Sequence, residues 1–146
     1  MFPTAPARDR SNLPPAVVVH GLDQACAALV PGLAVTLLSA PAAARFAGAG
    51  WWRALVAAAR ATHPATPCAD VLDCADAPGR AMEAIRIGQR ILVLDPACPA
   101  FARVASLATV LPDRPPALNL GARGASLRLR DWLGAAPEDD RPAPLR

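Results

Sequence analysis

Four short apolar runs of the sequence each end in a residue that can do chemistry. These residues are His20, Ser39, Asp73 and Asp95. Parallel α/β sheets bind ligands beside the carboxyl ends of their strands. We therefore expect the four side chains on one side of the domain, with Asp73 and Asp95 close to each other.

The pair Asp73 and Asp95 allows two interpretations. Close carboxylates repel each other unless a metal ion, a proton or an arginine lies between them, and Mg²⁺ binds such a pair. Each aspartate alone is also typical of a turn or a helix start. We predict no metal site. The four cysteines (26, 68, 74 and 98) lack C-x-x-C spacing, which argues against structural zinc.

The segment 76–80 is a candidate anion site. It joins a predicted strand to a predicted helix, so its backbone N–H groups face the same edge as the strand ends. Gly79 permits a close approach, and Arg80 can clamp a phosphate or a carboxylate. A plain helix start with Pro78 in the first position is the competing interpretation. The predicted ligand-binding set is His20, Ser39, Asp73, Asp76, Gly79, Arg80 and Asp95.

Cys74 is a candidate nucleophile at this edge. It needs a base, and His20 is the only histidine expected there. Nothing beside Cys74 marks such a pair. Whether the protein is an enzyme, and which cofactor it would use, therefore stays open.

The composition excludes several function classes. All 15 basic residues are arginine, and the chain has neither lysine nor tyrosine. A Walker-type phosphate loop, a Schiff base and a pyridoxal phosphate anchor all need lysine. A Tyr/Lys hydride-transfer site is impossible for the same reason. Nucleic acid is an improbable partner because the net charge is only +3 and aromatic residues make up 4%.

Hydrophobic runs and helical periodicity alternate along the chain. Strands are expected at 16–20, 33–39, 69–74, 90–95 and, as a possible fifth, 117–120. Helices are expected at 22–30, 41–62 with a break at 48–50, 79–87 and 99–111. This alternation predicts an α/β fold with an open parallel sheet of four to five strands and helices on both faces. We expect the flavodoxin-like order 2-1-3-4-5, or alternatively half of a (βα)₈ barrel.

The predicted domain covers residues 15–134, between a disordered arm (1–14) and a disordered tail (135–146) rich in proline. No secretory signal is recognised, and the isolated cysteines favour the cytoplasm. The stretch 24–44 carries no charge and is long enough to cross a bilayer. However, Pro31-Gly32 and Pro41 interrupt it, so we expect a helix, a turn and a strand rather than a membrane span.

The C-terminal segment adds a prediction of self-association. Leu129, Trp132 and Leu133 follow the last βα unit and need a surface to cover them. We expect a homodimer through this segment, with docking on the same chain as the alternative. The sequence thus favours a non-catalytic, self-associating interaction domain. A protein or enzyme that binds a small anionic ligand at the strand edge is the second hypothesis.

Overall fold

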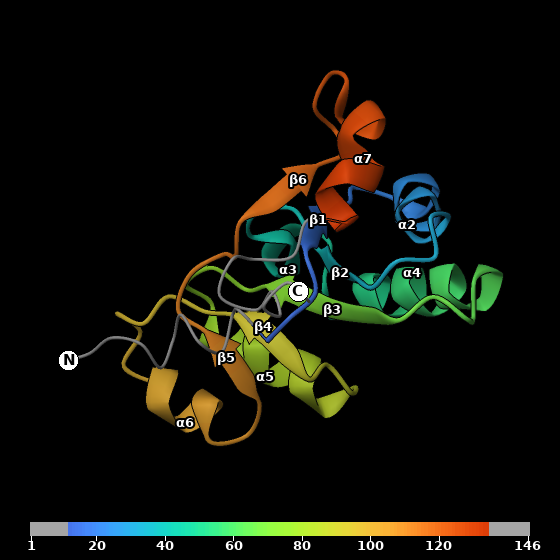
Figure 1. Cartoon of the computed structure of the whole chain (residues 1–146). Helices are drawn as coiled ribbons and strands as arrows, with labels where there is room; N and C mark the ends of the chain where they lie inside the picture. Colours follow the sequence, from blue (N-terminus) through green and yellow to red (C-terminus); the bar gives the residue numbers. More distant parts are fainter. Residues whose placement is uncertain (1–11, 135–146) are drawn as a thin grey trace, which may run out of the picture.

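A parallel sheet forms the centre of the protein. The computed structural model describes residues 12–134, so the tail and most of the predicted disordered arm lie outside it. The strands are β1 (Ala16–Val18), β2 (Val35–Leu38), β3 (Cys68–Asp73), β4 (Ile91–Val93), β5 (Thr109–Leu111) and β6 (Ala117–Asn119). All five strand pairings are parallel, and the spatial order is β5-β4-β3-β2-β1-β6 (Figure 1). The α/β class with an open parallel sheet is confirmed.

Helices follow the strands along the chain. They are α2 (Leu22–Leu29), α3 (Ala43–Phe46), α4 (Ala49–Thr62), α5 (Pro78–Arg86), α6 (Phe101–Ala105) and α7 (Ala125–Gly134). Gly48, at φ +89°, separates α3 from α4 at the predicted break. Pro78 occupies the start of α5, where its missing N–H is not needed. No helix of residues 12–134 is long and apolar enough to cross a membrane.

The predicted strand order is wrong. β2 lies between β1 and β3, with Val17 opposite Leu37 and Leu37 opposite Asp70. The last strand, β6, pairs with the other side of β1. The chain therefore winds in one direction from β1 to β5 and then returns across the sheet through residues 112–116. The predicted number of strands was also too low, because the end of the expected helix 99–111 forms β5.

The helices cover one face of the sheet, so the prediction of helices on both faces is wrong for the described residues. Buried residues from all six helices join one hydrophobic cluster with Val17, Leu37 and Leu72 of the strands. The cluster on the other face contains strand residues and Leu13, with no helical residue from the described part of the chain. Right-handed crossovers that always step the same way place their helices on the same face. The half-barrel alternative has this winding, but the return of β6 beside β1 departs from it.

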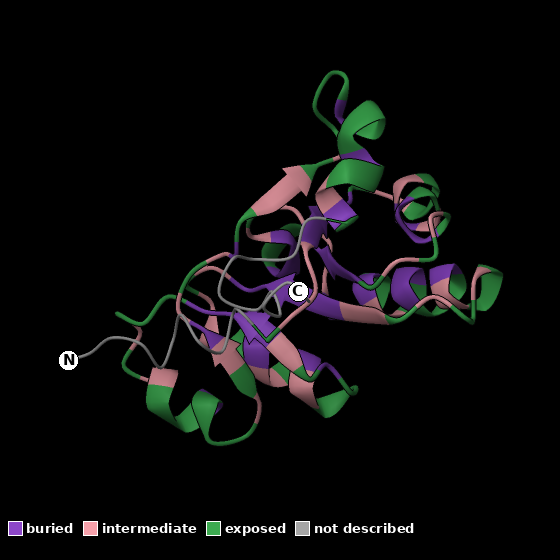
Figure 2. Cartoon of the chain, viewed as in Figure 1, coloured by how far each residue is buried: buried purple, intermediate pink, exposed green. Residues whose placement is uncertain are grey.

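Burial is greatest in the middle of the sheet. Figure 2 shows buried residues along β1, β2, β3 and β4, whereas β6 and most of α6 are half-buried or exposed. Trp52 of α4 is fully buried and is the largest side chain in the core. The central strands therefore provide a rigid base for the loops at their carboxyl ends.

Candidate binding site at the carboxyl edge of the sheet

A pocket of about 470 Å³ opens at the carboxyl ends of the strands. Its walls come from the loops that follow β2, β3, β4 and β5. The lining residues are Pro41, Ala42, Arg45, Asp73, Ala75, Asp76, Val93, Asp95, Pro112, Asp113 and Arg114. The volume is in the range of pockets that hold small organic ligands, about 300–1,000 Å³.

A partly buried ion pair closes the inner wall of this pocket. Arg114 Nη1 donates to Asp73 Oδ2 at 2.7 Å and to the carbonyl oxygen of Ser39 at 3.0 Å. The backbone N–H of Ala75 donates to Asp73 Oδ1 at 2.8 Å. The Asp73 side chain is 6% exposed and that of Arg114 is 26% exposed. Arg114 therefore compensates the charge of Asp73, and it forms no pair with Asp95.

Ser39 has a structural position beside this pair. Its hydroxyl accepts the backbone N–H of Asp73 at 2.9 Å and donates to the carbonyl oxygen of Ala40 at 3.1 Å. The side chain is fully buried. Ser39 therefore connects the end of β2 to the end of β3. Its hydroxyl is not placed to act as a nucleophile, because it is buried and engaged in both of these hydrogen bonds.

The outer part of the pocket carries exposed carboxylates. Asp76 Oδ1 lies 3.2 Å from Arg45 Nη1, and both side chains are more than half exposed. Asp95 is exposed, and its Oδ1 accepts the backbone N–H of Ala97 at 2.9 Å. Within residues 12–134 no basic side chain pairs with Asp95. The carboxylate of Asp95 thus gives the pocket a negative charge that its arginines do not neutralise.

Two backbone positions on the wall adopt an uncommon conformation. Ala42 and Ala75 have φ values of +60° and +52°, and no other non-glycine residue of the described chain has a positive φ. Alanine in this region costs on the order of 1–2 kcal/mol. Such positions are often found at functional sites, where the surrounding structure holds them.

The predicted site residues separate into two groups. Asp73, Asp76 and Asp95 line one pocket, whereas His20, Gly79 and Arg80 are not among its lining residues. Arg80 instead forms an exposed pair with Glu83 at 3.1 Å.

His20 lies at the end of β1, where its Nε2 and Asn119 Oδ1 are 2.8 Å apart. Gly121 packs against this histidine so closely that a Cβ there would lie 3.0 Å from the ring. Asn119 Oδ1 also accepts the backbone N–H of Gly121. His20 therefore belongs to the β1–β6 end of the sheet, and β2 separates it from the strand that carries Asp73.

Cys74 is not placed for nucleophilic chemistry. Its side chain is fully buried in the core. Burial, and then the negative charge of Asp73, raise the pKa of the Cys74 thiol to about 12. Because the thiolate is the reactive form, this thiol is inert at neutral pH.

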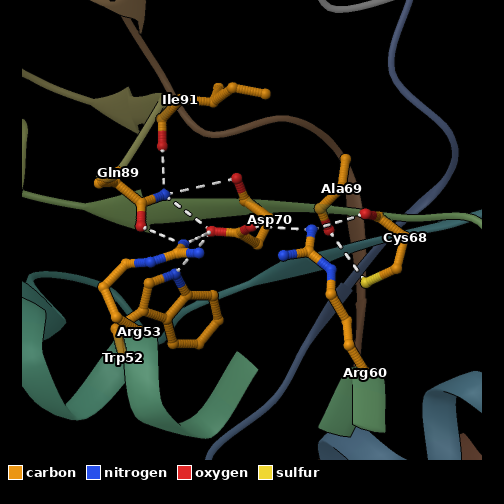
Figure 3. A network of polar contacts seen from close by, with 8 residues as sticks. All are labelled: Trp52, Arg53, Arg60, Cys68, Ala69, Asp70, Gln89 and Ile91. Carbon is orange, nitrogen blue, oxygen red and sulfur yellow. Dashed lines mark hydrogen bonds and ion pairs between the residues drawn. The ribbon is translucent and has the colours of Figure 1, made fainter. Parts of the chain in front are cut away.

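A second polar network lies inside the fold, on the helical face of β3 (Figure 3). Asp70 Oδ2 accepts from Trp52 Nε1 at 3.2 Å, from Arg53 Nη1 at 2.7 Å and from Gln89 Nε2 at 2.9 Å. Its Oδ1 accepts from Arg60 Nη2 at 3.1 Å. Both carboxylate oxygens are therefore satisfied, and the network attaches α4 to the sheet.

The arginine contacts at these two centres were not predicted from the sequence. Arg114 stands in a proline-rich loop, and nothing local connects it to a strand end reached much earlier in the chain. Asp70 had a detectable signal. It is an acid inside an apolar strand, and Arg53 and Arg60 share one face of the helix that precedes it.

The described residues contain no group of three or more His, Cys, Asp or Glu side chains arranged to hold a metal ion. The exposed carboxylates of the pocket can accept hydrogen bonds from the N–H groups of an organic molecule, and such bonds are strong when the donor is charged. No protein-family model matches the chain, and the search of curated proteins finds no relative.

Proposed function

We propose that the protein binds a small organic cation, an amine or a guanidine, in the pocket at the carboxyl edge of the sheet. The observation that carries this proposal is the charge of Asp95. Asp73 and Asp76 each have an arginine beside them, but Asp95 lines the same pocket with no basic partner in residues 12–134. A carboxylate without a counter-charge on a concave surface attracts cations.

Asp76 provides a second acceptor. Its pair with Arg45 is exposed on both sides, and exposed pairs of this kind contribute about 0–1 kcal/mol to stability. A ligand cation can therefore replace the guanidinium of Arg45 at little cost. A molecule with two amino groups is suited to a pocket that offers both Asp76 and Asp95.

The arrangement gives less support to the anionic ligand expected from the segment 76–80. Arg114 is held by Asp73, and Arg80 is paired with Glu83 outside the pocket. Anions are nevertheless the natural comparison in a binding experiment.

We propose binding and not catalysis as the role of this site. The described part of the edge does not bring a reactive nucleophile and a base together, since Cys74 is buried and His20 bonds to Asn119. The cytoplasm stays a prediction, favoured by the four free cysteines.

A thermal-shift screen tests the proposal. The full chain is heated with small amines, diamines and guanidines, and in parallel with phosphate, sulfate and dicarboxylates. A ligand at about 100 times its Kd adds about 2.7 kcal/mol to the free energy of unfolding. We expect the melting temperature to rise with one or more cations and to stay unchanged with the anions.

The variant Asp95→Asn should abolish that rise, because it removes the charge and keeps the shape. Asp23→Asn is the matched control, since Asp23 is exposed, lies in the first turn of α2 and does not line the pocket. Stabilisation by anions alone, or an equal response of Asp95→Asn and the parent protein, would contradict the proposal.

A further inference from the structure

A groove of about 660 Å³ lies between β6 and α7. We call it the β6–α7 groove. It is lined by Ala117, Leu118, Asn119, Ala122, Arg128, Asp131 and Trp132. β6 is the edge of the sheet, with β1 on one side and no strand of the described chain on the other (Figure 1). An uncovered edge strand can pair with a further strand.

The groove carries opposite charges without a partner in the described part of the molecule. Arg128 and Asp131 are three residues apart on α7, and both are exposed. Neither side chain forms an ion pair or a hydrogen bond within residues 12–134. A surface with one positive and one negative group at a fixed spacing is complementary to an inverted copy of itself.

Helix α7 is already docked on its own sheet. Leu129 and Leu133 are 7% and 6% exposed, and both belong to the core. Trp132 Nε1 donates to the carbonyl oxygen of Ala16 at 2.7 Å. The expectation that these three side chains form the dimer contact therefore needs revision for Leu129 and Leu133. Trp132 lines the groove, and the exposed residues of α7 beside it there are Arg128 and Asp131.

We propose that two copies of this chain associate through the β6–α7 groove, around a two-fold axis perpendicular to the sheet. This axis makes β6 antiparallel to the β6 of the second copy and joins the two sheets into one. It also keeps both helical layers on the same side, so the two α7 helices lie antiparallel across the axis. Arg128 of each copy then faces Asp131 of the other.

The backbone of β6 supports this pairing. The N–H of Leu120 donates to the carbonyl oxygen of Val18 on the β1 side. By the alternation of a β-ladder, Ala117 and Asn119 direct their N–H groups away from β1. With Leu118 on the axis, Ala117 of one copy stands opposite Asn119 of the other, which is the arrangement that exchanges two backbone hydrogen bonds. The carbonyl oxygen of Asn119 already accepts the N–H of Ala122 at 3.0 Å, so it receives the bond from the second copy on its other lone pair.

The occupant is a second copy and not an unrelated peptide, because one symmetric contact satisfies both the free strand edge and both unpaired charges. The proposed dimer contact is independent of the pocket at the carboxyl edge, because none of the groove residues lines that pocket.

Sedimentation equilibrium of the full chain at micromolar concentrations measures its oligomeric state directly. We expect the parent protein to have twice the monomer mass of 15.1 kDa. Arg128→Asp places two carboxylates opposite each other, and Asp131→Arg places two guanidinium groups opposite each other, so each variant alone should be monomeric. An equimolar mixture of the two variants should form a 1:1 heterodimer. One chain is then acidic at both positions 128 and 131 and the other is basic at both, so each of the two facing pairs joins opposite charges.

Arg130→Asp is the matched control, with the same change in net charge at an exposed position of α7 outside the groove. It should remain dimeric. A monomeric parent protein would overturn the proposal and leave the groove to a different chain. A dimer that persists in both single variants, or a mixture that stays monomeric, would overturn it as well.

Discussion

Arg114 Nη1 and Asp73 Oδ2 lie 2.7 Å apart although 41 residues separate them in the sequence. The pair fixes the loop that returns across the sheet to the carboxyl end of β3. It also compensates the charge of Asp73, so that the exposed carboxylates of Asp76, Asp95 and Asp113 decide which ligand the pocket attracts.

Replacing Arg114 with methionine should strongly destabilise the protein. The substitution leaves the buried carboxylate of Asp73 without its counter-charge, and breaking such pairs costs about 3–5 kcal/mol. Because Arg114 is partly exposed, we expect the lower end, about 3 kcal/mol, in urea unfolding. The double variant Asp73→Asn/Arg114→Met should lose less than Arg114→Met alone. A value within about 0.5 kcal/mol of the parent would show that the pair does not hold the loop.

Asp70→Asn should also lower the free energy of unfolding, by about 2–3 kcal/mol. Asparagine keeps the shape of the side chain, but the guanidinium groups of Arg53 and Arg60 would face each other without a negative charge. Glu83→Gln is the matched control, because it removes one carboxylate from an exposed pair. If the two variants unfold at the same urea concentration, the network of Figure 3 is not what attaches α4 to β3.

Stability should fall at alkaline pH because of Cys74. The pKa of its thiol is about 12 in the folded protein, against 9.0 for a thiol in water. The unfolded chain therefore releases this proton first, and the folded state loses stability as pH rises from 9 towards 12. The loss approaches about 1.4 kcal/mol per pH unit. The chain has no lysine or tyrosine to titrate in this range.

Urea unfolding between about pH 8 and 10.5 measures this effect as a slope. Cys74→Ala should reduce this slope, whatever the variant does to stability at the lower end of the range. Part of the slope should remain, because burial also raises the pKa of the Cys68 thiol. Cys26→Ala, at a half-buried position, is the comparison. An unchanged slope in Cys74→Ala would show that this thiol is not buried in the native state.

Gly121→Ala tests the contact at the other end of the sheet. A Cβ at this position would lie 3.0 Å from Cδ2 and Nε2 of His20 and 3.2 Å from Asn119 Oδ1, so these two side chains must shift by a few tenths of an ångström, which weakens the hydrogen bond between them. We expect a cost of about 0.5–1 kcal/mol. In the His20→Ala background the same substitution should cost less, because the contact with the ring is gone, only the contact with Asn119 Oδ1 remains, and alanine restricts the unfolded chain. Equal costs in both backgrounds would contradict this packing.

Local patterns located most of the elements but not their arrangement. The runs that precede His20, Ser39, Asp73 and Asp95 are strands because their apolar residues can be buried on both faces. The order of the strands depends on which strands pair in the sheet, and the residue types within one strand do not determine its neighbours. β5 was missed because Phe101, Val104 and Ala108 continue the helical spacing up to the residue before the strand.

The site was predictable to the same extent. The carboxyl-edge rule brought Asp73, Asp76 and Asp95 together, since it depends only on the direction of the strands. It could not place Arg114 or Arg45, whose contacts depend on how distant loops fold over that edge. Nor could it separate His20 from the pocket, because that required the position of β1 in the sheet.

A titration followed by ¹H–¹⁵N NMR tests the central claim most directly. The ¹⁵N-labelled full chain is titrated first with 1,4-diaminobutane and then with the cation that raises its melting temperature most in the thermal-shift screen. The account predicts saturable shifts of the amides that surround the pocket, at Ala42, Ala75, Asp76, Asp95 and Arg114, and their loss in Asp95→Asn. Shifts that do not saturate, that occur only outside the pocket, or that persist unchanged in Asp95→Asn would contradict cation binding at this edge.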